Sequence, residues 1–180
     1  MNLRSSLLVQ LMAHKKWMDM GLYEVLQSPA YADRPDAVQQ ALYWMNHIHI
    51  VDQIFRSHML GKPHGFTSTE SNFFPPLLQL REATEGLDDW LIQYAQELDD
   101  VAAGEEIDFF FTDGDKGRMS RAQMLMHLAS HGLYHISVTT HELSNQGLPT
   151  PPLLLTTCLG QEAARETQFS NVGQAPRYST

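Results

Sequence analysis

The sequence predicts an all-α protein, a four-helix bundle of the up-down-down-up type with one long crossover connection. Three observations support this prediction. Apolar residues recur at spacings of three, four and seven along four long segments, which is typical of amphipathic helices. A stretch rich in Gly, Ser and Thr separates the second of these segments from the third. The chain has 180 residues, enough for one domain that buries a sizeable core.

The first two helices are bounded by recognisable start and stop signals. An apolar stripe places the first helix at about residues 2–27, where a Ser-Pro pair ends it. The second helix is expected to start near Asp33, which can cap a helix, with Pro35 in its first turn. It continues to about Leu60, where a Gly-Lys-Pro sequence stops it.

The third helix follows the crossover loop, which we place at residues 61–74. It is expected to begin near the two prolines at 75 and 76 and to end before Gly104. Residues 106–119 have a different pattern, because an aromatic, β-prone run is followed there by the tight-turn pair Asp113-Gly114. We therefore expect a short hairpin-like excursion before the fourth helix.

The fourth helix has the clearest boundaries. Ser120 and Gln123 match a capping box, and Gly147 followed by Pro149 gives a stop signal in the expected order. We assign residues 1–150 to the bundle domain. Residues 151–180 are expected to form a C-terminal extension that is partly helical, with its last ten residues disordered.

Composition and charge exclude several classes of function. The formal net charge is −9, and only 12 residues are Lys or Arg, which argues against a nucleic-acid partner. No window approaches the roughly 18 apolar residues of a membrane span, so we expect no membrane partner. Cys158 is the single cysteine, which excludes an intrachain disulfide and favours a cytoplasmic location. A small-molecule substrate is the remaining expectation.

The nine histidines are the unusual feature of the composition. A helix turns about 100° per residue, so spacing gives the direction of each side chain. His47 falls inside the apolar stripe of the second helix, and His131 and His135 fall one turn apart on the inward face of the fourth. An i, i+4 histidine pair can close on one ion, and a third imidazole from a facing helix completes a site with open positions.

Other histidines are placed by the same reasoning. His58 lies on the same side of the second helix as His47, whereas His49 is expected to face solvent. His127 lies at the edge of the inward face of the fourth helix. A purely structural alternative remains open, in which the inward histidines bond to carbonyls or to Tyr134, because each unpartnered buried polar group costs about 1–3 kcal/mol. The chain has no HExxH, Glu-x-x-His, Walker A, GxGxxG or GxSxG motif.

Three stretches resemble the DinB-like (YfiT-like) family of metal-binding four-helix bundles. They are AHKKWMDMGLYEVL at 13–26, MNHIHIVDQIF at 45–55 and FTDGDKGRMSRAQMLMHLASHGLYH at 111–135. The resemblance implies a metal site formed by His47, His131 and His135, and it implies a homodimer. It also implies transferase or isomerase activity with a low-molecular-weight thiol, as in some relatives. The family has Arg-Gly-Gln after its last ligand, whereas His135 is followed here by Ile-Ser-Val.

We therefore expect a divalent-metal-dependent enzyme that activates a thiol cofactor. Zinc or nickel suits imidazole ligands, and iron or manganese is also compatible with them. His127 and Tyr134 are the candidate catalytic residues, for handling a proton or orienting a substrate. Two alternatives remain: a metal-dependent hydrolase that uses the same ligands, and a non-catalytic bundle that binds a metal or a small molecule.

Overall fold

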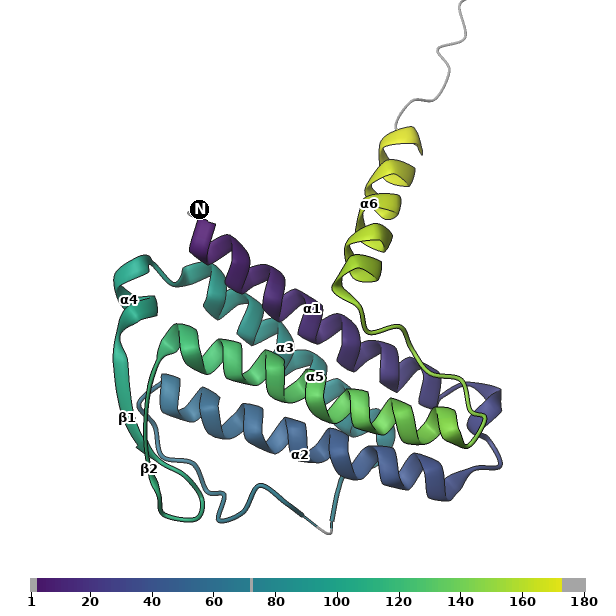
Figure 1. The fold of residues 1–180 in the computed structure, drawn as a ribbon, viewed down its shortest axis with the longest axis horizontal. Helices are drawn as coiled ribbons and strands as arrows, with labels where there is room; N and C mark the ends of the chain where they lie inside the picture. Colours follow the sequence, from purple (N-terminus) through teal and green to yellow (C-terminus); the bar gives the residue numbers. More distant parts are fainter. Residues whose placement is uncertain (1–2, 72, 173–180) are drawn as a thin grey trace, which may run out of the picture.

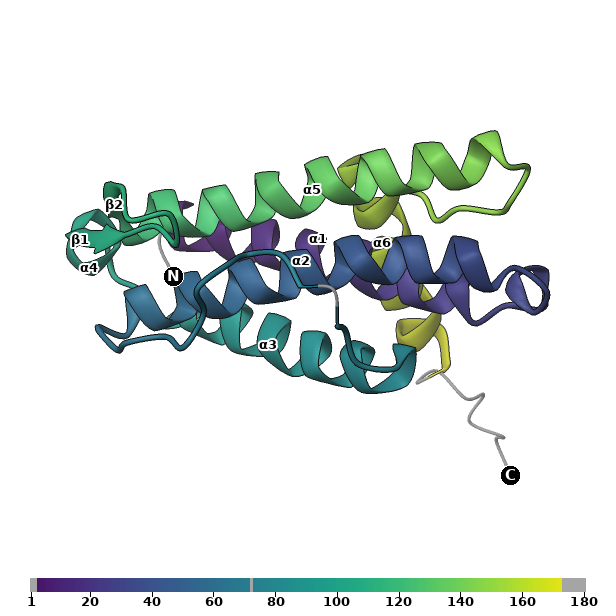
Figure 2. The ribbon, with the colours of Figure 1, turned by 90° about the horizontal axis from the view of Figure 1, so that it is seen from below.

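The computed structural model describes residues 3–71 and 73–172, and it is mostly helical, as the all-α prediction requires. Four long helices lie alongside one another, and a small hairpin sits at one end of them (Figures 1 and 2). None of the described helices combines the length and the apolarity that crossing a membrane would need. In chain order the elements are α1 (Leu3–Leu26), the 3-10 turn η1 (Pro29–Tyr31), α2 (Pro35–Met59), α3 (Leu77–Glu97), α4 (Asp100–Gly104), β1 (Glu106–Phe110), β2 (Lys116–Ser120), α5 (Arg121–Asn145) and α6 (Leu155–Val172).

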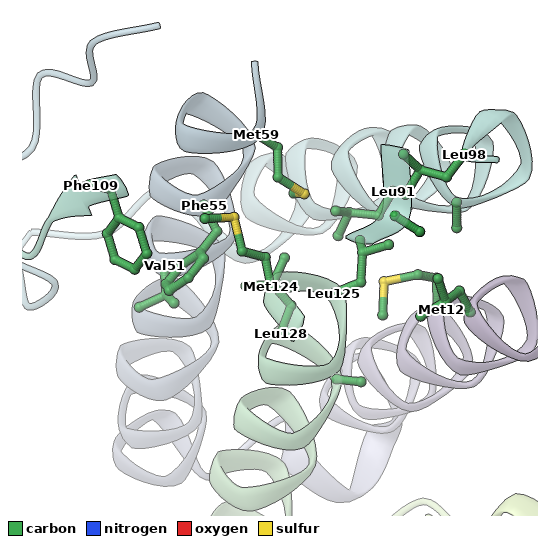
Figure 3. Close-up of a cluster of buried hydrophobic side chains, with 14 residues drawn as sticks. Met12, Val51, Phe55, Met59, Leu91, Leu98, Phe109, Met124, Leu125 and Leu128 are labelled. Carbon is green, nitrogen blue, oxygen red and sulfur yellow. The ribbon is translucent and has the colours of Figure 1, made fainter. Parts of the chain in front are cut away.

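The long helices bury their apolar stripes in two adjoining clusters. In the cluster of Figure 3, Phe55 and Met59 of α2 face Leu91 of α3 and Leu125 of α5, and Phe109 of β1 covers one side. The second cluster lies toward the other end of the helices and includes Tyr23, Met45, Ile48, Leu80 and Ile136. Each such side chain contributes on the order of 1.5–3 kcal/mol when fully buried. These contacts fix the angular position of α2 against α5.

The predicted hairpin is confirmed. Strands β1 and β2 pair antiparallel, with Phe109 opposite Gly117. Gly114 has a φ of 93°, which the turn requires and which a residue with a side chain rarely adopts. A Cβ at position 117 would lie 2.4 Å from the Phe109 ring, so only glycine leaves room for that ring.

The predicted ends of α5 are also confirmed. The Gln123 amide N–H donates to Ser120 Oγ at 3.2 Å, and the Ser120 amide donates to Gln123 Oε1 at 2.8 Å, which completes the capping box. At the other end Gly147 has a φ of 73°. The Leu148 amide there donates to the Leu143 carbonyl at 3.1 Å, as in a Schellman motif.

Two predicted boundaries differ from the structure. The third helix ends at Glu97, because Asp99 caps a separate short helix by accepting hydrogen bonds from the amides of Val101 and Ala102. The second helix begins at Pro35 with Arg34 at its N-cap, so Asp33 is not the cap that the sequence predicted. In the C-terminal extension, α6 (Leu155–Val172) projects away from the other helices (Figure 1). Most of the segment predicted to be disordered, residues 173–180, lies outside the described residues.

The connection to α6 is fastened to α1 and η1. The hydroxyl of Tyr31 donates to the Pro149 carbonyl at 2.7 Å, and His14 Nε2 donates to the Leu153 carbonyl at 2.9 Å. Trp17 of α1 donates from Nε1 to the side chain of Gln161 in α6 at 3.1 Å. His14 is thereby engaged with the extension.

Candidate metal centre

Three histidines converge where α2 faces α5. One nitrogen from each of His47, His131 and His135 lies within 4.8 Å of the others. The ring centroids are 5.0 Å apart for His47 and His131, 4.6 Å for His47 and His135, and 4.5 Å for His131 and His135. The i, i+4 spacing brings the two α5 rings together edge-on, at an angle of 64°, and the packing of α2 on α5 brings the third ring to them.

The proton on His47 is positioned by a backbone carbonyl. His47 Nδ1 lies 2.9 Å from the Thr69 carbonyl oxygen, in the loop between α2 and α3. A carbonyl can only accept, so Nδ1 carries the proton and Nε2 presents a lone pair. That Nε2 lies 3.1 Å from His131 Nε2. The Thr69 contact is the kind of outer interaction that orients a metal-binding histidine.

Trp44 forms a wall of the histidine cluster. Its ring stacks on His135 at a centroid distance of 4.9 Å and an angle of 24°, and it meets His47 edge-on at 5.9 Å. Trp44 precedes His47 by three residues on α2, so the two side chains lie on the same side of the helix. In the structure the Trp44 side chain restricts the rotation of two of the three imidazole rings.

The two histidines of α5, His131 and His135, are neutral at neutral pH. Burial, together with the neighbouring histidines, lowers the pKa of His131 to about 3. Burial likewise lowers the pKa of His135 to about 4, with His47 adding to the effect. Neutral imidazoles keep the lone pairs that a metal ion needs. The residues present therefore fit a divalent ion of the imidazole-binding class.

The two candidate catalytic residues lie beside the cluster. The His127 ring is 5.5 Å from that of His131, and burial lowers the pKa of His127. The Tyr134 ring meets His135 edge-on at 5.0 Å, but its side chain is 65 % exposed. His127 is thus the better placed of the two to act on a group bound near the three imidazoles.

The expectation that His49 faces solvent is wrong. His49 is half-buried, and its Nδ1 lies 3.3 Å from the hydroxyl of Thr84 on α3, which in turn lies 3.1 Å from the hydroxyl of Tyr23. Burial lowers the pKa of His49 to about 4, and the charge of Lys15 contributes. The helical-wheel argument failed because α3 covers the side of α2 that is opposite His47.

Sequence reasoning missed a buried ionic cluster behind the histidines. Lys15 Nζ lies 2.8 Å from Asp19, 2.7 Å from Asp52 and 2.8 Å from Asp88, so α1, α2 and α3 each supply a carboxylate. The lysine stem runs beside Gly132, where an added Cβ would be 3.7 Å from Lys15 Cε. The Lys15–Asp19 spacing of four was the available signal, but such pairs are usually exposed.

The pKa values of Lys15, Asp52 and Asp88 differ strongly from their ordinary values. Burial acts to lower the pKa of Lys15, but the three carboxylates outweigh it and raise that pKa. Burial raises the pKa of Asp52 to about 6, although Lys15 opposes the shift. The pKa of Asp88 is raised as well, chiefly by burial. One ammonium group cannot neutralise three ionised carboxylates, and Asp52 and Asp88 accordingly retain protons at a higher pH than ordinary aspartates.

Three imidazoles that gather between two helices make this helical protein a candidate metal-binding protein. A family model described as the DinB family matches residues 3–164, and the chain belongs to that family. This confirms the resemblance found in the sequence. The comparisons with curated proteins and with solved structures gave no match.

Proposed function

We propose that this protein is a metal-dependent enzyme whose divalent ion is held by His47, His131 and His135. The observation that supports the proposal most directly is the convergence of three ring nitrogens within 4.8 Å. The Thr69 carbonyl adds to it, because it keeps the proton of His47 on Nδ1 and leaves Nε2 to bind. Three protein ligands leave positions open for a reactant, as in catalytic rather than structural sites.

A divalent ion held there supplies positive charge that lowers the pKa of a coordinated water or thiol. Zinc and nickel are the ions we propose, since both suit neutral imidazole, and iron and manganese are the next candidates. Trp44 keeps the His135 and His47 rings oriented. His127 stays neutral near pH 7 and lies next to His131, so it can accept a proton from a reactant.

A cavity that is lined in part by Trp44, the neighbour of His135, supports a small-molecule substrate. It has a volume of about 500 Å³ and shares Trp44 with the metal centre. Its other lining residues are Asp36, Gln39, Gln40, Tyr43 and Phe74. This lining can bind a polar molecule and provides no cation. We propose a transferase or isomerase that uses a low-molecular-weight thiol, and the hydrolase is the alternative that shares the same ligands.

We propose that four helices form a bundle of the up-down-down-up type and that the protein is a homodimer. The described residues 60–71 of the connection, which run back along α2 in Figure 2, support this helix order. An apolar groove of about 420 Å³ supports the dimer, since Leu7 and Met126, which are more than half exposed, line it together with Leu11 and Leu155. Sedimentation equilibrium of wild type and Met126→Glu tests the dimer, which the variant should weaken.

The metal assignment is tested by elemental analysis of protein purified without metal-affinity resin and dialysed against chelator-free buffer. Wild type should retain close to one equivalent of a transition metal, and His131→Ala should lose it. His141→Ala is the matched control, because His141 is an exposed histidine on the same helix. Full retention of the metal by His131→Ala would refute the assignment.

The reaction class is tested with glutathione, bacillithiol and mycothiol, each offered with a chromogenic electrophile. A rate that requires both thiol and metal supports the transferase proposal. A panel of chromogenic esters and amides without thiol tests the hydrolase alternative. Metal binding without activity in either panel would favour the non-catalytic binding protein.

A further inference from the structure

A second pair of histidines lies at the far end of α2, apart from the metal centre. His58 is in the last turn of α2, and His64 is in the loop that follows. Their ring centroids are 5.1 Å apart and their planes are nearly perpendicular, at 81°. Both rings line a cavity of about 420 Å³.

Each ring has a buried nitrogen without a partner. His58 Nε2 and His64 Nδ1 are both shielded from solvent, and neither has a hydrogen-bond partner among the described residues. Burial lowers the pKa of His58, and the neighbouring His64 lowers it further, so the His58 ring is neutral at neutral pH. Buried polar groups are usually satisfied in native proteins. These two unpartnered nitrogens belong to adjacent rings that line one cavity, so a single ligand could satisfy both.

The fold holds the two rings in place. Gly61, with a φ of 62°, ends α2 and reverses the chain, so that His64 returns toward His58. The turn is closed by the Lys62 amide, which donates to the Ser57 carbonyl at 2.9 Å. From the hairpin, Phe109 lies against His58 at a ring distance of 4.7 Å and an angle of 30°. The carbonyl end of a helix also favours a positive charge nearby.

We propose that His58 and His64 bind a second transition-metal ion of the class that prefers imidazole, such as Zn²⁺, Ni²⁺ or Cu²⁺. Asp108 of β1 lines the same cavity and is the carboxylate available to this ion, and Lys62 is the cation on the same lining. Two imidazoles make this site weaker than the three-histidine centre.

The second ion is separate from the first. His58 follows His47 by eleven residues on one helix, which corresponds to about 16 Å along the axis. The metal ions of a two-metal active site lie only about 4 Å apart. The second site therefore takes no part in chemistry at the first, and either site can exist without the other.

The test is an isothermal titration calorimetry experiment, in which Zn²⁺ is added to the whole chain after its metal has been removed. Wild type should bind two ions with distinct affinities. His64→Asn should reduce the Zn²⁺ affinity of the weaker site at least tenfold and leave the tighter site unchanged. His131→Ala should lose Zn²⁺ binding at the tighter site and keep it at the weaker site. His141→Asn should behave as wild type. Circular dichroism establishes that each variant is folded, and because His64 is in a loop, its replacement leaves the helices intact.

A spectroscopic measurement identifies the ligands. In the His131→Ala protein, one equivalent of Cu²⁺ should give an electron paramagnetic resonance spectrum with coupling to imidazole nitrogen, and His58→Asn should reduce that coupling. The proposal is overturned if wild type binds a single Zn²⁺, or if His58→Asn and His64→Asn both leave the weaker binding unchanged. In either of these cases the three-histidine centre is unaffected, so the two proposals fail separately.

Discussion

The ammonium group of Lys15 lies 2.7 Å from the carboxylate of Asp52, and neither side chain is exposed to solvent. This pair joins α1 to α2 directly behind the candidate metal centre, since the lysine stem passes Gly132, the neighbour of His131. Asp19 and Asp88 complete the surroundings of the same ammonium group. The mutual position of three helices thus depends on one cation.

Replacement of Lys15 by methionine should therefore strongly lower the free energy of unfolding. Methionine fills most of the space but leaves three buried carboxylates without a counter-charge, and breaking a buried ion pair in this way costs about 3–5 kcal/mol. Urea denaturation at pH 7 measures the loss, which should shrink at pH 5 as the carboxylates gain protons. Lys16→Met is the matched control, because Lys16 pairs with Asp89 at the surface, and its loss should not exceed about 1 kcal/mol. Equal losses in the two variants would contradict the prediction.

Asp52→Asn should change the pH dependence of stability in a definite direction. The pKa of Asp52 is raised by burial from 3.8 to about 6. Between these values the unfolded chain has released the proton and the folded chain retains it, so the contribution of this group falls as pH rises. Asparagine resembles the protonated acid and lacks this loss. The stability of the variant relative to wild type should therefore increase from pH 4 to pH 6.

This comparison uses urea midpoints at both pH values, so any constant effect of the substitution cancels. Asp33→Asn, which changes an exposed carboxylate, should track wild type across the range. A difference between Asp52→Asn and wild type that stays constant with pH would show that Asp52 is ionised in the folded protein throughout.

Tryptophan fluorescence should report metal binding at the three-histidine centre. Trp44 stacks on His135 at 4.9 Å, so a paramagnetic ion such as Co²⁺ should quench its emission up to one equivalent. Trp44→Phe should remove most of this quenching and weaken binding by about tenfold, as expected for an outer contact that orients a ligand. Trp90→Phe should retain the quenching, since Trp90 is on α3, where its ring packs against Arg56 of α2 and contacts none of the three histidines. Unchanged quenching in Trp44→Phe would place the ion elsewhere.

Gly117→Ala should destabilise the hairpin. The added Cβ would lie 2.4 Å from the Phe109 ring, and overpacking of this kind costs about 1–3 kcal/mol. Because Phe109 packs on His58, the substitution should also weaken the second metal site. Gly104→Ala is the control, since an added Cβ there meets nothing within 4 Å. Thermal melts of the two variants that coincide would contradict the crowding at position 117.

Helical periodicity predicted the long helices, and the approach of His131 to His135 follows from their spacing of four residues. The capping box of α5 was equally visible, because it depends on residues three positions apart. The apolar periodicity of the second helix likewise places His47 on its inward face. These features are local, or depend only on which face of a helix is apolar.

What could not be predicted depends on partners distant in sequence. A wheel for α2 alone places His49 in solvent, and only the position of α3 brings Thr84 to it. The burial of Lys15 was missed because its three carboxylates come from three helices, and charged residues are normally taken as surface. The break between α3 and α4 was missed because the cap provided by Asp99 competes with continuation of the helix.

The hydrogen bond from His47 to the Thr69 carbonyl has a consequence for how this centre can vary. The acceptor is main chain in an irregular segment, so no side-chain substitution at position 69 removes it, while an insertion or deletion nearby would. Withdrawal of that oxygen frees the imidazole to hold its hydrogen on Nε2 and closes the nitrogen that faces His131. A change in the length of the loop between α2 and α3 can thus abolish metal binding at this centre while all three histidines are retained.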